Sequence, residues 1–230
     1  MQVAEAQKPW KGAGMEGWVA RWYTRTRSND MEDFRREAAA VAKRLRSGSD
    51  VLELAPGPGF FSIELSKLGD FRITGLDISR TLVGIATQNA RDAGAAVDFR
   101  LGNASAMPFD DESFDFIYCS AAFKNFSEPV KALDEMHRVL RRGGEAVVSD
   151  LCKDASLEEI DRYVKNSGRG PVDAWMTKWT FRHLLLKRAY TEDDFVRMAR
   201  QSCFGACRAA ISSIGIEVRF TKAVRPGPSA

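Results

Sequence analysis

Between residues 50 and 151, short apolar runs alternate with segments in which apolar residues recur at helical spacing. The apolar runs have the length of strands, and the longer amphipathic segments have the length of helices. Strands alternating with helices of this length predict right-handed crossovers and a mostly parallel sheet with helices on both faces. The strands are expected at 50–55, 72–79, 97–103, 114–120 and 144–151, and the helices at 60–69, 80–94 and 128–144.

The flanking segments follow different patterns. Residues 31–46 and 156–168 have the spacing of amphipathic helices, whereas residues 169–190 are aromatic and basic and show no strand pattern. Thr191 has the side chain of a helix N-cap and begins a further helix. Residues 208–223 supply a final pair of strands. The whole pattern predicts a Rossmann-like, doubly wound α/β fold with a seven-stranded sheet.

Length and composition indicate one globular domain with additions. The 230 residues are 44% hydrophobic and 28% charged, which is ordinary for a protein with a full core. The expected parts are an N-terminal helical extension that also forms part of a lid, a central core, a helical lid insertion, a last helix with two strands, and a disordered tail. Their bounds are 1–46, 47–151, 152–190, 191–224 and 225–230.

Several classes of protein do not fit this composition. No apolar run approaches the ~18 residues of a membrane span, and the first residues lack the apolar region of a signal peptide, so we expect a cytoplasmic protein. The four cysteines are too few and scattered for a disulfide framework, and no histidine lies near Cys203 and Cys207 to complete a metal site. The net charge is only +3, and the sequence lacks the dense basic stripe that is typical of a nucleic-acid-binding protein.

Four unusual segments fall where the predicted parallel strands end, which is where ligands bind in open α/β sheets. The first holds Gly57 and Gly59, which let the backbone approach a ligand, ahead of a helix with free N–H groups. The second ends on Asp77, a carboxylate able to accept from both hydroxyls of a ribose. The third is "GNASAMPF" and the fourth is "CSAAFKNF". The spacing from the glycine loop to Asp77 also fits a Rossmann dehydrogenase.

In this order and at these distances, the motifs resemble class I S-adenosylmethionine-dependent methyltransferases. They are most similar to the small-molecule type that includes the ubiquinone and menaquinone biosynthesis C-methyltransferases. The resemblance covers residues 51–151 through "VLELAPGPGFF", "GLDIS", "GNASAMPFDDESFDFIY" and "HRVLRRGGEAVVSD". The segment "MPFDDESFD" is typical of these methyltransferases, and the glycine loop begins with alanine, which disfavours the dehydrogenase. The implied cofactor is S-adenosyl-L-methionine, with S-adenosyl-L-homocysteine as product.

The resemblance implies a set of cofactor contacts. A carboxylate on the first strand can hold the cofactor's ammonium, Asp77 accepts from the ribose, and an aromatic residue descends onto the cofactor from the N-terminal segment. Family members usually have aspartate at the adenine edge, where this chain has Asn103, whose carbonyl can accept from the exocyclic amine without charge. The implied contacts are Tyr23, Glu53, Ala55, Pro56, Gly57, Gly59, Asp77, Ile78, Asn103, Ala104, Cys119 and Ser120, the last two through backbone carbonyls.

Methyl transfer from a sulfonium is an in-line displacement, so the enzyme mainly aligns the reactants and excludes water. A base is needed only if the acceptor must lose a proton. The candidates for acceptor contact or catalysis are Tyr23, Lys124 and His183. Lys124 is interpreted either as an anion-binding or basic group or as a solvated lysine at a helix start. His137 is interpreted as structural.

The acceptor is expected between the cofactor loop and two segments in which aromatic residues alternate with cations, "MEGWVARWYTR" and residues 169–190. Such segments suit a lid over a flat, apolar or aromatic small molecule, including an anionic one. The aromatic residues of the insertion are equally explained as the packing of the lid itself or as a surface for a homodimer. The remaining alternatives are a protein or nucleic-acid methyltransferase, disfavoured by the absence of an Asn-Pro-Pro-Tyr-like motif, and a catalytically silent cofactor-binding protein.

Overall fold

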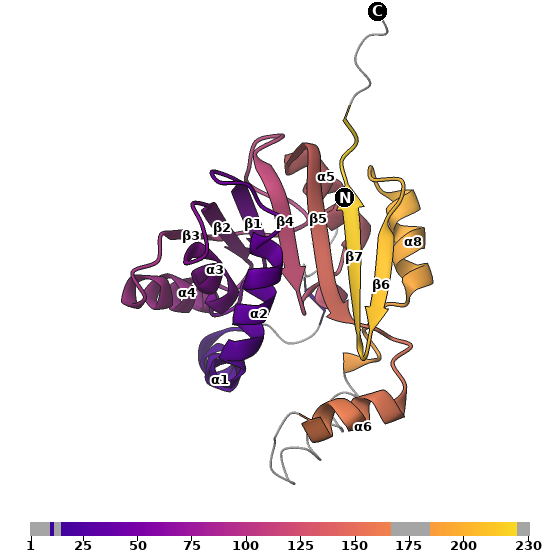
Figure 1. Cartoon of the computed structure of the whole chain (residues 1–230), viewed down its shortest axis with the longest axis horizontal. Helices are drawn as coiled ribbons and strands as arrows, with labels where there is room; N and C mark the ends of the chain where they lie inside the picture. The colour runs from indigo at the N-terminus through magenta and orange to yellow at the C-terminus, as the bar shows by residue number, and fades with distance from the viewer. Residues whose placement is uncertain (1–9, 12–14, 167–184, 225–230) are drawn as a thin grey trace, which may run out of the picture.

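The computed structural model of the chain describes residues 10–11, 15–166 and 185–224 (Figure 1). Its strands are β1 (Asp50–Leu54), β2 (Arg72–Asp77), β3 (Val97–Leu101), β4 (Phe114–Ser120), β5 (Leu140–Leu151), β6 (Arg208–Ser212) and β7 (Gly215–Thr221). The α-helices are α1 (Gly17–Arg27), α2 (Met31–Ala42), α3 (Phe60–Ser66), α4 (Arg80–Asp92), α5 (Pro129–Val139), α6 (Leu157–Asn166) and α8 (Glu192–Gln201), and the short 3₁₀ helices are η1 (Ser28–Asp30) and η2 (Phe123–Asn125).

All the strands join one seven-stranded sheet in the order β3-β2-β1-β4-β5-β7-β6. Strands β1 to β5 pair in parallel, and β7 pairs antiparallel with both β5 and β6. The predicted Rossmann-like fold is therefore confirmed. Because the chain winds outward from β1 to one edge and returns to β4 on its other side, the point where the winding reverses lies between β1 and β4. Ligands of open α/β sheets bind beyond the carboxyl ends of the strands at such a point.

Helices cover both faces of the sheet (Figure 1). On one face, α2 and α3 bury an apolar layer against the four central strands, and α4 packs beside them on β3. On the other face, α5 and α8 cover β1, β4, β5 and β7. The alternation of side chains along each strand supplies both layers, as expected for strands buried on two sides. Helix α1 lies beside the start of α4 and the loop after β1, and α6 lies beyond the carboxyl end of β5 (Figure 1).

The boundary between α5 and β5 differs from the prediction. The sequence pattern extends the helix to Gly144, but α5 ends at Val139, and Leu140 already has an extended backbone. The ammonium of Lys222 accounts for part of this, because it donates to the Leu140 carbonyl oxygen at 2.8 Å. Gly143 has φ of +78°, and the pairing of β5 with β4 shifts register there. Sheet pairing and a distant lysine thus override a helical pattern that is local.

The flanking segments largely follow the prediction. Thr191 caps α8, since its hydroxyl oxygen accepts from the Asp194 N–H at 3.0 Å while the Asp194 carboxylate accepts from the Thr191 N–H at 3.0 Å. The helix expected over 31–46 is α2, which ends at Ala42, and it follows the additional helix α1. Residues 167–184, which hold most of the predicted lid insertion, lie outside the described residues. Among the described helices, none has both the length and the apolar character required to cross a membrane.

Candidate cofactor and methyl-transfer site

The loop between β1 and α3 has three residues with left-handed backbone within five positions. Ala55, Gly57 and Gly59 have φ of +54°, +56° and +80°. Glycine adopts this conformation without strain, whereas alanine at φ +54° is strained by its Cβ. This explains why a glycine is usual at the first position, and it shows that Ala55 retains the loop shape. The loop is closed by the Gly59 N–H, which donates to the carbonyl oxygen of the buried Pro56 at 3.0 Å.

The two glycines of the loop have different surroundings. A Cβ at Gly59 would lie 2.6 Å from the Phe99 ring and 3.0 Å from the Ala86 Cβ, so this side of Gly59 faces the core. A Cβ at Gly57 would lie 3.3 Å from Cε1 of Tyr23 on α1. Packing against the core therefore requires glycine at Gly59, and the approach of a ligand to the backbone at both glycines stays a prediction. Gly57 lies beneath Tyr23, as the prediction for that aromatic residue requires.

Asp77 ends β2 and joins the glycine loop to helix α4. Its carboxylate accepts from the Gly57 N–H at 3.1 Å and from the Ser79 N–H at 2.8 Å. Ser79 in turn caps α4, because its hydroxyl oxygen accepts from the Leu82 N–H. Burial raises the pKa of Asp77 to about 6. The carboxylate is thus held by backbone donors beside the loop, with no cation of the described chain paired with it.

Glu53, at the end of β1, is 4% exposed and likewise has no basic partner among the described residues. The Ser62 hydroxyl on α3 donates to its carboxylate. Burial raises the pKa of Glu53 to about 8, and the nearby carboxylates of Glu37 and Asp77 add to the effect. A buried acid with this pKa is a group that a bound cation would stabilise in its charged form.

Glu37 on α2 is a further acid at this end of the site, and the sequence analysis missed it. Its carboxylate accepts from the hydroxyls of Tyr118 at 3.2 Å and Ser120 at 3.3 Å. Burial raises the pKa of Glu37. Ser120 therefore faces the acidic end, whereas the Cys119 side chain is fully buried in the core on the other face of the sheet. The only available signal was a glutamate between Phe34 and Ala38, two residues of the buried face of the helix.

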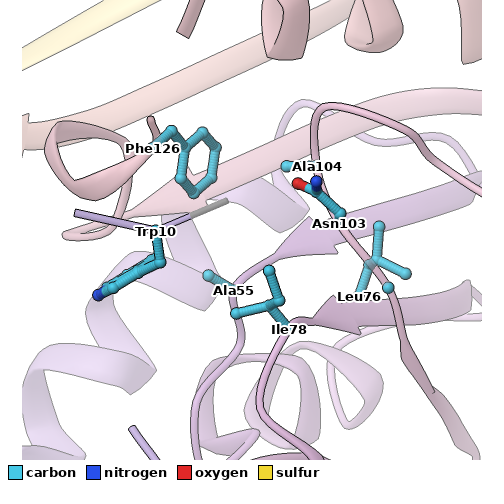
Figure 2. A pocket seen from close by; sticks show the side chains of 8 residues that line it. Trp10, Ala55, Leu76, Ile78, Asn103, Ala104 and Phe126 are labelled. Carbon is cyan, nitrogen blue, oxygen red and sulfur yellow. The ribbon is translucent and has the colours of Figure 1, made fainter. Parts of the chain in front are cut away.

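A pocket lies beside the loop, lined by residues of the loop, of β2 and of the segments after β2, β3 and β4, together with Trp10. Figure 2 shows the side chains around it: two aromatic residues stand on one side, aliphatic residues of the loop and of β2 form the centre, and the segment after β3 forms the far side. The lining consists of Trp10, Ala55, Leu76, Ile78, Gly102, Asn103, Ala104 and Phe126. Three residues predicted to meet adenine, Ile78, Asn103 and Ala104, are thus brought together by the fold.

Asn103 is the one polar side chain in this lining. Its Oδ1 atom accepts from the Ser105 N–H at 3.0 Å, which fixes the amide across the segment after β3. The segment continues into "MPFDDESFD", which is held to α5 by several hydrogen bonds. The Met107 N–H donates to Glu135, and the Arg138 guanidinium donates to the Phe109 carbonyl at 2.8 Å. The motif typical of the resemblance therefore positions one wall of the pocket.

Trp10 and Phe126 were not predicted for the site. Their backbones form an isolated antiparallel bridge, and their ring centroids lie 6.3 Å apart. Trp10 precedes the core by some forty residues of chain, and no local pattern indicates what it packs against. Phe126 belongs to "CSAAFKNF", which was recognised as unusual, but its spacing does not show which of its side chains faces a ligand.

Lys124 is not a solvated lysine. It is 5% exposed, and its ammonium donates to the Asp150 carboxylate and to the Ala121 carbonyl, both at 2.6 Å. The Lys124 N–H donates to the same carboxylate at 3.0 Å. Ala121 has φ of +55°, so the pair secures a strained turn between β4 and η2. A role for Lys124 in acceptor binding or proton transfer stays a prediction, and it would require the ammonium to leave Asp150.

Of the two histidines, only His137 lies among the described residues. It is half-buried on α5, its ring lies 5.1 Å from that of Phe204, and burial lowers its pKa. These contacts agree with a structural role. His183, the other predicted catalytic candidate, lies outside the described residues.

The doubly wound sheet, the left-handed loop at the switch point and a buried carboxylate at the end of β2 are features of the Rossmann-like class of methyltransferase folds. Comparison with known proteins agrees with this class. The family model described as a methyltransferase domain matches residues 52–148. A protein from Methanococcus maripaludis described as an S-adenosyl-L-methionine-dependent methyltransferase superposes with a TM-score of 0.74 at 17% identity, covering 97% of this chain and 99% of that one.

Two curated relatives define the family further. The demethylmenaquinone methyltransferase of Deinococcus radiodurans is 35% identical over 122 residues, covering 53% of this chain and 51% of the relative. The ubiquinone/menaquinone biosynthesis C-methyltransferase of Roseobacter denitrificans is 30% identical over 181 residues, covering 74% of this chain and 72% of the relative. The chain spans only about half the length of the first curated relatives that it matches, among them the protein from Deinococcus radiodurans. The chain belongs to the S-adenosylmethionine-dependent methyltransferase family that includes these C-methyltransferases.

The site fits the cofactor of this family. Two buried carboxylates without basic partners, Glu53 and Asp77, suit an ammonium and a pair of ribose hydroxyls. The apolar pocket with a single amide, that of Asn103, suits a flat heteroaromatic ring. The glycine loop offers its backbone to the cofactor at Gly57, and the Tyr23 ring lies next to this glycine. The ammonium, the ribose hydroxyls and the adenine of S-adenosylmethionine therefore each have a region of matching chemistry among the described residues.

Proposed function

We propose that this protein transfers a methyl group from S-adenosylmethionine to a small-molecule acceptor. The observation that carries the proposal is the pair of buried carboxylates beside the left-handed loop, Glu53 and Asp77, which have no basic partner among the described residues. Such carboxylates are costly in a ligand-free protein, because burial disfavours their charged forms. A ligand that brings an ammonium and two hydroxyls to them removes this cost. The cofactor supplies an electrophilic methyl group on a sulfonium.

We assign the remaining work of the site to orientation and exclusion of water. Asp77 would accept from the ribose hydroxyls, Glu53 would hold the ammonium, and Tyr23 would cover the loop at Gly57. Helix α1, which carries Tyr23, is fixed to α4 by the Glu16 carboxylate, which accepts from the N–H groups of Arg80 and Thr81 at 2.9 and 3.0 Å. This fixation supports a site that is already formed before the cofactor arrives.

For the acceptor we propose a flat, largely apolar ring, tested first as a quinol. The names of the curated relatives concern menaquinone and ubiquinone, and both contain such rings. The acceptor would enter beside α1, next to the cofactor loop at Gly57. Methylation at a ring carbon or oxygen releases one proton, and Tyr23, Lys124 and His183 remain the candidates to assist its removal.

The test is methyl transfer from isotopically labelled S-adenosylmethionine to a panel of small molecules headed by quinols, followed by mass spectrometry. The wild-type protein should label at least one acceptor, and the Gly57→Val variant should label none. Valine at φ +56° is strained, and its side chain would meet Tyr23. Circular dichroism should remain nearly native.

Two results of this test would contradict the proposal. Labelling of protein or nucleic acid in place of every small molecule would favour the macromolecular alternative. Cofactor binding without transfer to any class of acceptor would favour a catalytically silent binding protein. Binding is measured separately by calorimetry with S-adenosylhomocysteine, so a failure of the acceptor panel is not confused with a failure of the cofactor site.

A further inference from the structure

Lys11 joins three parts of the chain that are far apart in sequence. Its N–H donates to the Asn125 carbonyl at 2.8 Å, and its own carbonyl accepts from the Arg188 guanidinium at 3.1 Å. Its ammonium donates to the Tyr190 hydroxyl at 2.8 Å. One residue of the N-terminal segment is therefore bonded both to η2 and to residues 185–190, through its backbone and its side chain alike.

The partners of Lys11 are themselves fixed. The Tyr190 ring packs at 6.0 Å from Phe123 and 5.7 Å from Phe195, and its backbone forms a bridge with Cys152 at the end of β5. The Asn125 carbonyl belongs to the turn that the buried pair of Lys124 and Asp150 secures. Lys11 is thus attached to the sheet on two sides, and the bonds hold the residue next to it, Trp10, in place.

Trp10 lines the pocket between the loop after β1 and the segment after β3 (Figure 2). The other walls belong to the sheet or to loops that follow its strands. Without Trp10, the side opposite Asn103 and Ala104 would keep only Phe126. An aromatic ring beside a purine stabilises it by stacking and by excluding water from it.

We infer that Trp10 is a cofactor-binding residue that covers the adenine, and that Lys11 is the positioning residue that holds it there. The inference rests on the proposed function, since the pocket must receive the adenine. It goes beyond that function because it links the cofactor pocket to residues 185–190, which the bridge between Tyr190 and Cys152 joins to the end of β5. It also predicts that the N-terminal segment contributes to affinity and not only to folding.

The test compares single variants by calorimetry with S-adenosylhomocysteine and by steady-state kinetics. Trp10→Ala should raise Kd for the cofactor product about tenfold or more, as expected for the loss of one base-stacking ring. Lys11→Met should raise it about tenfold, because a hydrogen bond from a charged donor is lost. Both should raise KM for the cofactor and leave kcat within about twofold. Lys11→Arg, which can still donate to Tyr190, should restore most of the affinity.

The hydrogen bond is isolated by a double-mutant cycle. Tyr190→Phe keeps the packed ring and removes only the hydroxyl, so this single variant should raise Kd for S-adenosylhomocysteine. The double variant Tyr190→Phe with Lys11→Met should bind little more weakly than Lys11→Met alone. The matched control is Lys131→Met, which removes a lysine from the exposed face of α5, and it should bind like the wild type. Melting temperatures of all variants should stay close to that of the wild type, which separates positioning from stability.

Two outcomes overturn the inference. If the wild type binds S-adenosylhomocysteine and Trp10→Ala and Lys11→Met bind it equally well, the assignment of Trp10 and Lys11 is wrong while the proposed function stands. If the wild type does not bind S-adenosylhomocysteine at all, the proposed function fails, and this inference fails with it. Wild-type affinity in Lys11→Met beside weakened binding in Trp10→Ala would show that the backbone bonds, and not the ammonium, hold the segment, and would overturn the role assigned to the Lys11 side chain.

Discussion

The two ends of the cofactor site recognise ligands by different physical means. At the end proposed for methionine and ribose, Glu37, Glu53 and Asp77 are buried acids whose pKa values are all raised by burial. At the end proposed for adenine, the lining is apolar apart from one neutral amide, that of Asn103. One end therefore depends on charge and on pH, whereas the other depends on shape. The pH dependence of binding should therefore come from the acids proposed to contact methionine and ribose, and not from the residues proposed to contact adenine.

The pair formed by Lys124 and Asp150 connects the two ends, because the turn that it secures runs from Ser120 to Phe126. Removing one partner leaves the other charge buried and unpaired, so we expect Lys124→Met to destabilise the protein by about 3–5 kcal/mol. Urea unfolding monitored by circular dichroism measures this loss. The double variant Lys124→Met with Asp150→Leu removes both charges and should recover a large part of it.

A different result for Lys124 would revive its role in acceptor binding. If Lys124→Met keeps the wild-type stability and raises KM for the acceptor far more than KM for the cofactor, the ammonium must serve the acceptor and not the fold. Equal effects on both KM values would contradict that role.

Asp77 should have the largest effect on affinity at the charged end. Asp77→Ala removes the acceptor for the ribose hydroxyls and leaves the N–H groups of Gly57 and Ser79 without a partner. We expect Kd for S-adenosylhomocysteine to rise by about 100-fold. Because the hydrogen bonds favour the ionised carboxylate and its pKa is about 6, wild-type affinity should also fall as the pH drops through 6. Unchanged affinity in Asp77→Ala, measured by calorimetry, would refute the assignment of the ribose.

Glu53 should have a smaller effect on affinity and a larger effect on pH dependence. With a pKa of about 8 it is mostly protonated at pH 7, and a bound ammonium would favour its charged form. Binding should therefore release a fraction of a proton at pH 7, and affinity should rise as the pH increases toward 8. Calorimetry in two buffers of different ionisation enthalpy measures this release. In Glu53→Gln the release from this group should vanish, and affinity should fall by about tenfold.

The same pKa has a consequence for stability. The folded-state pKa lies above the ordinary value of 4.5, so the stability that Glu53 contributes in its protonated form is present below pH 4.5 and is lost as the pH rises through 8. Glu53→Gln should then stabilise the ligand-free protein at pH 9 by an amount on the order of 2 kcal/mol, or roughly 4–8 °C in Tm, and by little at pH 5. The exposed residue Glu32 provides the control Glu32→Gln, which should change neither value.

The contrast between the two ends also explains what the sequence could predict. The strand pattern, the left-handed loop and Asp77 are encoded within a few neighbouring residues, and the fold and the position of Asp77 at the loop followed from them. Glu37 and Trp10 reach the site from separate elements, and only the packing of α2 and of the N-terminal segment brings them there. Lys124 was found by its unusual setting, but its burial depends on Asp150, twenty-six residues further along the chain.

The adenine end should respond least to a change of charge, and Asn103 tests this. Asn103→Asp introduces the residue usual in the family, whose charge strengthens the hydrogen bond to the exocyclic amine but must be buried in an apolar pocket. We expect these effects nearly to cancel, changing Kd for S-adenosylhomocysteine by about threefold or less.

Discrimination between purines should change more than affinity. The amide of Asn103 can both donate and accept, so the wild type should tolerate S-inosylhomocysteine, which has a carbonyl oxygen where adenine has the amine. An ionised aspartate can only accept a hydrogen bond, so its carboxylate and the carbonyl oxygen of the inosyl compound would face each other with no hydrogen between them. Asn103→Asp should therefore raise Kd for the inosyl compound by a further ~10-fold relative to the adenosyl compound. Equal preference for the adenosyl over the inosyl compound in both proteins would show that Asn103 does not meet the purine edge, and that the pocket recognises adenine by its apolar walls alone.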